Sequence, residues 1–118
     1  EKMLFQREKK AQELRKNCRD GEGAVLFEAF CQAESLPKPY RMFSEAVLEK
    51  GCSIGKHFHE GETEIYYVLE GRATIDDNGA TVTADKGDMH ICYSGQYHSV
   101  KNDCEEPLRL LCVIARES

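Results

Sequence analysis

The pattern of hydrophobic and polar positions changes near residue 20. Over residues 2–17 the apolar residues fall roughly along one stripe of a helix, and charged residues fill the other faces. Asn17 and the glycine-containing segment 20–23 follow, and glycine is the usual residue just past a helix end. We therefore predict a short N-terminal α-helix and assign it to residues 1–20.

From residue 24 onward the chain consists of short strand-like runs separated by turn residues. The segment 76–79, Asp-Asp-Asn-Gly, is a strong hairpin signal because asparagine and glycine tolerate the positive φ angles of tight turns. About eight or nine strands with no helix between them predict an all-β antiparallel barrel or sandwich, which we assign to residues 21–118. The predicted strands are residues 24–31, 41–48, 64–69, 72–76, 80–84, 89–92, 98–102 and 108–116.

The composition narrows the classes of partner. A chain of 118 residues fits one domain. No apolar run approaches the roughly 18–20 residues that a membrane-spanning helix needs, and no secretory signal pattern opens the sequence. The net charge of −5 and the isoelectric point near 5.4 disfavour a nucleic-acid partner, which would require a basic face. We therefore expect neither a membrane nor a nucleic-acid partner.

The six cysteines favour free thiols over a disulfide framework. They stand alone, without a CxxC pair, and several lie inside apolar strand-like runs where cysteine is a common small buried residue. This pattern predicts a reduced, cytoplasmic protein. The cysteines are Cys18, Cys31, Cys52, Cys92, Cys104 and Cys112.

Three of the four histidines fall into an arrangement that suits metal binding. His57 and His59 are separated by one residue, so in a strand their side chains point to the same face and can occupy adjacent coordination positions. Glu64 follows past a turn at Gly61, and a neighbouring antiparallel strand would carry its carboxylate towards them. His98, at the start of a later strand, is a candidate fourth ligand. Each residue taken alone has a simpler explanation, as an exposed or hydrogen-bonded side chain, and only the set of intervals favours a site.

Two stretches resemble the conserved motifs of the cupin superfamily. Residues 51–71 match the first motif, G(X)5HXH(X)3–4E(X)6G, at every interval. Residues 87–102 are similar to the second motif, G(X)5PXG(X)2H(X)3N, except that Tyr93 stands in place of a proline that shapes a turn and binds no metal. The resemblance implies a cupin double-stranded β-helix, or jelly-roll barrel, behind the N-terminal helix.

The same resemblance implies one bound divalent transition-metal ion. Its ligands would be His57, His59, Glu64 and His98. Three imidazoles and one carboxylate suit Mn²⁺, Fe²⁺, Co²⁺, Ni²⁺ or Zn²⁺, whereas a closed structural zinc site more often uses cysteine. In an octahedral ion, four protein ligands leave two positions for other molecules.

Other residues are candidates for supporting roles. If Glu64 points inward, Tyr66 points inward too, and it can orient a substrate or donate a proton, or it can be a core tyrosine. His90 lies outside the motif positions, which favours a surface position or a place behind the ligands. Cys52 and Cys92 lie near the motifs and fit either small buried residues or redox-sensitive thiols.

The strand that begins at Glu64 is apolar on both faces. Ile65, Tyr66, Tyr67 and Leu69 follow one another with little alternation, whereas a strand packed on one side only alternates more cleanly. Either the N-terminal segment or a second subunit therefore covers its outer face. Small cupins are often homodimers, so we expect a homodimer.

Three functions are compatible with these observations. The first is a mononuclear metalloenzyme acting on a small polar molecule, by dioxygenase, decarboxylase, isomerase or lyase chemistry. The alternative is a non-catalytic module that binds a small ligand such as a sugar or a carboxylate. In the third, the metal only stabilises the fold of the barrel and takes no part in catalysis or ligand binding.

Overall fold

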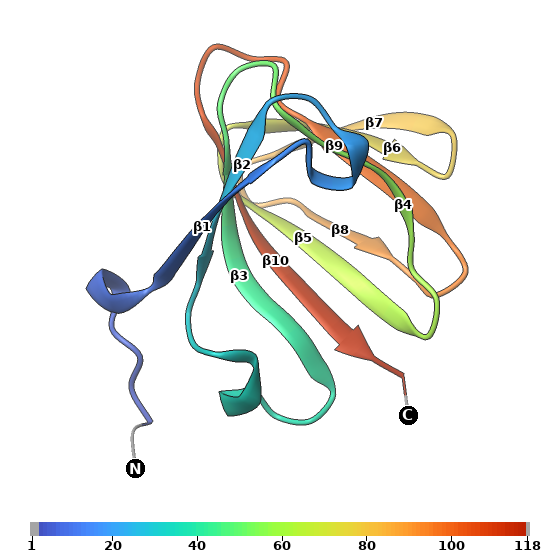
Figure 1. The fold of residues 1–118 in the computed structure, drawn as a ribbon. Helices are drawn as coiled ribbons and strands as arrows, with labels where there is room; N and C mark the ends of the chain where they lie inside the picture. Colours follow the sequence, from blue (N-terminus) through green and yellow to red (C-terminus); the bar gives the residue numbers. More distant parts are fainter. Residues whose placement is uncertain (1–2, 118) are drawn as a thin grey trace.

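Two antiparallel β-sheets make up the part of the chain that the computed structural model describes, residues 3–117 (Figure 1). One sheet has the strand order β1-β2-β3-β10-β5-β8 and the other has the order β4-β9-β6-β7. The predicted all-β class is confirmed. The strands are β1 (Ala11–Lys16), β2 (Ala24–Ala29), β3 (Tyr40–Leu48), β4 (Ser53–Phe58), β5 (Glu62–Glu70), β6 (Arg72–Asp77), β7 (Ala80–Asp85), β8 (Met89–Cys92), β9 (Tyr97–Lys101) and β10 (Leu108–Arg116).

The predicted N-terminal α-helix is wrong. Within the described residues the helical elements are three short 3-10 turns, η1 (Arg7–Lys9), η2 (Cys18–Asp20) and η3 (Ala33–Ser35). Strand β1 pairs along its whole length with β2, and all six of its residues are exposed. A sparse apolar stripe gives a helix little to bury, whereas the free edge of β2 offers backbone hydrogen-bond partners, so tertiary pairing overrides the weak helical pattern.

The segment expected to end that helix instead turns the chain from β1 into β2. Asn17 has φ 50° and Asp20 has φ 62°, in the left-handed region that asparagine and aspartate tolerate best. The extent of the barrel domain, residues 21–118, stays a prediction.

Every predicted strand from residue 24 onward is present, with ends within two residues of those observed. Strand β4 is present in the structure but was not among the predicted strands. Its sequence, Ser-Ile-Gly-Lys-His-Phe, lacks the apolar alternation that marks a strand, because its inward side chains are partly polar. Among the described residues, no helix has the length and apolar character that a membrane crossing requires.

The core lies between the two sheets and follows the two-residue period of the strands. In β5, Glu64, Tyr66 and Val68 are buried, whereas Tyr67 on the opposite face is 37% exposed. Side chains from both sheets fill the same interior. The largest buried apolar members are Tyr66, Leu48, Ile75, Leu108, Leu110, Val25, Val68 and Val100.

The last residue of the second motif secures a loop to the core. Asn102 is fully buried, and its Nδ2 donates hydrogen bonds to the carbonyl oxygens of Leu48 and Glu106, both at 2.9 Å. Its Oδ1 accepts a hydrogen bond from the backbone N–H of Cys104 at 2.9 Å. One side chain therefore satisfies three backbone groups, and Asn102 acts in the structure of the barrel.

We expect Asn102→Ala to lower the free energy of unfolding by about 3 kcal/mol, because buried backbone groups lose their partners and a small cavity forms. Equilibrium unfolding in urea measures this change. Asp103→Ala, at an exposed neighbouring position, is the control and should change stability by less than about 0.5 kcal/mol. Equal effects of the two substitutions would contradict the role given to Asn102.

Candidate metal centre

Four polar side chains meet in the interior between the sheets. His57, His59, Glu64 and His98 are each no more than 8% exposed, and their candidate ligand atoms all lie within 4.8 Å of one another. The structure thus brings together all four residues whose spacing suggested a metal site.

Strand pairing explains this convergence. His57 on β4 lies opposite His98 on β9, and directly opposed residues of antiparallel strands point to the same face. His59 follows at the end of β4 and shares the orientation of His57. The chain then turns at Gly61, where φ is 74°, and enters β5 in the other sheet, which presents Glu64 to the three histidines.

The three imidazoles converge on one carboxylate oxygen. Glu64 Oε1 lies 3.3 Å from Nε2 of His57, 2.8 Å from Nε2 of His59 and 3.0 Å from Nε2 of His98. Nε2 of His98 is 3.1 Å from Nε2 of His57 and 3.2 Å from Nε2 of His59. Adjacent nitrogens of an octahedral ion with bonds of about 2.1 Å are about 3.0 Å apart. The donor types and their separations therefore fit one transition-metal ion.

Two of the histidines are oriented from behind by hydrogen bonds. His57 Nδ1 lies 2.7 Å from the Gly55 carbonyl oxygen and donates to it, which directs Nε2 at the cluster. His59 Nδ1 lies 3.3 Å from a carboxylate oxygen of Glu62. Arg41 holds Glu62 in turn through two hydrogen bonds of 2.8 and 2.7 Å.

Glu62 and Arg41 were not identified from the sequence. A signal for Glu62 was present, since it lies two residues before Glu64 and a strand places both side chains on one face. Arg41 is 21 residues away from Glu62 along the chain, and no motif links them.

The electrostatics of the cluster favour an ionised carboxylate among the three imidazoles. Burial opposes ionisation of Glu64, but hydrogen bonds from the three histidines outweigh it and hold the pKa of the carboxyl far below its usual range. Burial lowers the pKa of His98 and outweighs the effect of Glu64. Burial also acts to lower the pKa of His59, yet its contacts with Glu64 and Glu62 raise it overall.

A cavity of about 60 Å³ adjoins the cluster. It is lined by His57, His59, Glu64 and Tyr66, and also by three arginines and by apolar side chains. This volume matches roughly two water molecules, so the cavity suits a ligand of a few non-hydrogen atoms. The remaining lining residues are Arg15, Cys18, Arg19, Phe27, Arg41, Met42, Ile54 and Ile114.

The N-terminal turn η2 forms one wall of this cavity and packs directly on β4. A Cβ atom on Gly55 would overlap the carbonyl oxygen of Arg19, and one on Gly21 would overlap that of Ser53. Two backbones therefore meet here without side chains between them, and only glycine permits this approach.

Tyr66 and the remaining candidates lie around the cluster. The Tyr66 ring stacks on His98, with ring centres 4.6 Å apart, and burial raises the pKa of its hydroxyl, which stays protonated. His90 is outside the four-residue group, and its side chain is 12% exposed. Cys92 is buried and Cys52 is half-buried. All six cysteines are free thiols, and the cytoplasmic location stays a prediction.

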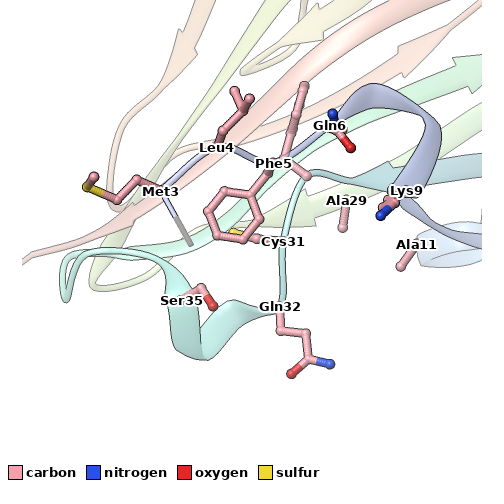
Figure 2. A pocket seen from close by; sticks show the side chains of 11 residues that line it. Met3, Leu4, Phe5, Gln6, Lys9, Ala11, Ala29, Cys31, Gln32 and Ser35 are labelled. Carbon is pink, nitrogen blue, oxygen red and sulfur yellow. The ribbon is translucent and has the colours of Figure 1, made fainter. Parts of the chain in front are cut away.

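A larger hollow, of about 670 Å³, lies beside the N-terminal segment (Figure 2). Its labelled side chains include Met3, Leu4 and Phe5 on one side and Gln32 and Ser35 on the other. No histidine or carboxylate among residues 3–117 lines it, whereas the candidate metal ligands border the smaller cavity.

Comparisons with known proteins agree with this geometry. The oxalate-binding protein of Thermotoga maritima is 39% identical over 98 residues, which cover 83% of this chain and 81% of that protein. The crystal structure of a predicted oxalate decarboxylase from Thermotoga maritima superposes with a TM-score of 0.92 at 35% identity, covering 97% of this chain and 99% of the other. KdgF from Halomonas has the same fold, with a TM-score of 0.78 at 14% identity over 100% of this chain and 96% of its own.

A family model described as Cupin domain matches residues 44–114, the segment that supplies all four candidate ligands. On this match and on the similarity to the Thermotoga maritima oxalate-binding protein, the chain belongs to the cupin domain family.

Proposed function

We propose that this cupin binds a small dicarboxylate, such as oxalate, at one divalent transition-metal ion held by His57, His59, Glu64 and His98. The ion would be Mn, Fe, Ni, Co or Zn, in the jelly-roll barrel implied by the motifs. The observation that carries the proposal is the small cavity beside the four ligands, lined by three arginines. The name of the oxalate-binding relative supports it.

The charge of the cavity suits an anion. Arg15 and Arg41 each pair with a glutamate, Glu13 and Glu62, whereas Arg19 has no ion-pair partner within residues 3–117. A guanidinium binds a carboxylate through two parallel hydrogen bonds, which gives both affinity and orientation. A bound metal ion would supply Lewis-acidic positions for carboxylate oxygens.

The size of the cavity distinguishes between a sugar and a carboxylate, the two kinds of ligand considered from the sequence. About 60 Å³ accommodates a two-carbon dicarboxylate better than a sugar ring with its hydroxyl groups. Arg41 lines the cavity and is also connected to the candidate metal ligand His59, because Glu62 accepts hydrogen bonds from both residues.

Turnover of the dicarboxylate is a second candidate function, and Tyr66 favours it. Its hydroxyl is buried, lacks a hydrogen-bond partner among the described residues and belongs to a residue that lines the cavity. Loss of CO₂ from a monoprotonated oxalate breaks the C–C bond and leaves a carbanion that still bears the O–H proton. Formate results once the carbon has accepted a proton from a donor and the O–H proton has returned to that donor. The protonated Tyr66 hydroxyl would be that donor, or would only hydrogen-bond to a ligand that does not react.

We also propose that the protein is a homodimer through the outer face of the larger sheet. Tyr67 on β5 lies opposite Leu111 on β10 and opposite Met89 on β8, which forms an apolar row across three neighbouring strands. Tyr67 is 37% exposed and Met89 is 58% exposed, and an exposed apolar row of this kind is typical of an interface.

The ligand assignment predicts about one metal ion per chain in the wild type and none in the double variant His57→Ala/His98→Ala, since two of four donors are then missing. Elemental analysis of protein purified without chelator or histidine tag measures both. Lys56→Ala, an exposed position on β4, is the control and should keep its metal. Metal retained by the double variant would refute the assignment, and a wild type that takes up no metal on reconstitution would refute the metal site.

The anion assignment predicts that metal-loaded wild type binds oxalate and not glucose in calorimetry. Arg41→Ala should weaken oxalate binding about 10–100-fold, because a charged hydrogen-bonding partner is lost. Arg72→Ala, a surface arginine paired with Asp85 outside the cavity, should leave it unchanged. Metal content is measured in parallel, so that lost metal is not mistaken for lost anion binding. Release of CO₂ and formate would establish turnover, and unchanged binding by Arg41→Ala would contradict its role.

The interface assignment predicts that the wild type sediments as a dimer and that Tyr67→Glu sediments as a monomer, because a buried unpaired charge opposes association. Val82→Glu places the same charge at a residue of equal exposure, 37%, in the other sheet, and should stay dimeric. Analytical ultracentrifugation distinguishes the outcomes. A monomeric wild type would rule out the homodimer.

A further inference from the structure

One of the three histidines in the cluster has no hydrogen bond at Nδ1, the ring nitrogen that points away from the cluster. Nδ1 of His57 donates to the Gly55 carbonyl, and Nδ1 of His59 contacts Glu62, but Nδ1 of His98 is buried and has no hydrogen-bond partner among the described residues. A buried ring N–H without a partner is costly, and a metal-binding histidine almost always donates its second ring N–H.

The other unpaired polar atoms lie beside His98. Within residues 3–117, the buried side-chain nitrogens and oxygens without partners are His98 Nδ1, both ring nitrogens of His90 and the Tyr66 hydroxyl. The rings of Tyr66 and His90 both stack on His98, with centres 4.6 and 5.6 Å away. The three side chains that carry these atoms therefore lie next to one another. A concentration of this kind marks a place where buried solvent completes the hydrogen bonding.

The register of the strands places His90 behind His98. His90 on β8 lies opposite the inward-facing Tyr66 on β5, so it also points between the sheets. Asp77 on β6 lies opposite His98 on β9 and points inward in the same way. Nε2 of His90 lies 3.6 Å from Oδ1 of Asp77, so the two residues join the sheets across the interior.

The His90–Asp77 contact lies on a different side of the cluster from the arginine-lined cavity. Neither His90 nor Asp77 lines that cavity, and the Asp77 side chain is 41% exposed. The aspartate therefore faces solvent on one side and His90 on the other, and the His90 ring in turn lies next to the His98 ring.

We propose that His90 is a positioning residue for His98. The His98 Nδ1–H donates a hydrogen bond to His90 through one intervening solvent molecule, and Asp77 orients the His90 ring. This support favours the tautomer of His98 that carries its proton on Nδ1, which makes the Nε2 lone pair available to a bound metal ion. The inference rests on the metal site of the proposed function and assigns a role to a histidine outside the cupin motifs.

Two substitutions at His90 separate hydrogen bonding from ring shape. His90→Phe keeps a stacking ring and removes both nitrogens, and His90→Gln keeps a hydrogen-bonding group and removes the ring. Metal-free proteins are titrated with Co²⁺, whose visible absorption reports both affinity and ligand geometry. We expect His90→Phe to weaken Co²⁺ binding about 10–100-fold with a changed spectrum, and His90→Gln to stay within about threefold of wild type with the wild-type spectrum.

Val82→Phe is the control, because it introduces the same side chain at an exposed position of β7, outside the cluster, and should bind Co²⁺ like the wild type. Circular dichroism of the metal-free proteins checks that each variant folds. Asp77→Asn provides an independent variant at a partly exposed position, and it should weaken Co²⁺ binding less than His90→Phe does. If His90→Phe does not fold, Asp77→Asn decides, and unchanged affinity there would overturn the proposal.

The outcomes distinguish this inference from the proposed function. A wild type that binds no Co²⁺ would overturn the metal site and the role of His90 together. Wild-type binding by both His90 variants would overturn the role of His90 and leave the metal site intact. Equal weakening by His90→Phe and His90→Gln would assign the effect to ring packing and would also overturn the proposal.

Discussion

A buried carboxylate shared by three imidazoles constrains the whole interior of this barrel. Glu64 comes from the larger sheet, whereas His57 and His98 come from paired strands of the smaller sheet, so their contact joins the two layers. Taking an ionised carboxylate out of water is costly unless it is closely paired. The apolar part of the core therefore supplies the stabilising free energy of folding. The cluster also requires the observed register of β4 against β9, because a shift by one residue would turn His57 outward.

Local intervals in the sequence were enough to predict the cluster and most of the strands. Two-residue alternation placed Glu64 and Tyr66 on one inner face, and the motif spacing identified the histidines that meet them. The same alternation offered a signal for Glu62, but its pairing with Arg41 was not predictable in this way, since that pairing depends on which strands come together in space. Strand β4 was not predicted because polar side chains, Ser53 and His57, share its buried positions with Ile54 and interrupt the aliphatic alternation that marks a strand.

The failed helix prediction bears directly on the site. As a strand and a turn, residues 11–20 place Arg15, Cys18 and Arg19 along the wall of the small cavity. A free helix would carry the same charges away from it. The sequence pattern was ambiguous because the segment is polar almost throughout, and the choice between helix and strand was made by the unpaired edge of β2 and not by the segment itself.

The close backbone packing at Gly55 joins two parts of the site that are chemically distinct. Its Cα faces the Arg19 carbonyl without an intervening side chain, and its own carbonyl accepts the hydrogen bond that orients His57. If an anion binds at Arg19 as proposed, a displacement of that residue would act on the peptide unit that orients the candidate ligand His57. Under the proposed function, anion occupancy and the rigidity of the metal site would therefore be mechanically coupled, and metal exchange would depend on the cavity wall as well as on the ligands.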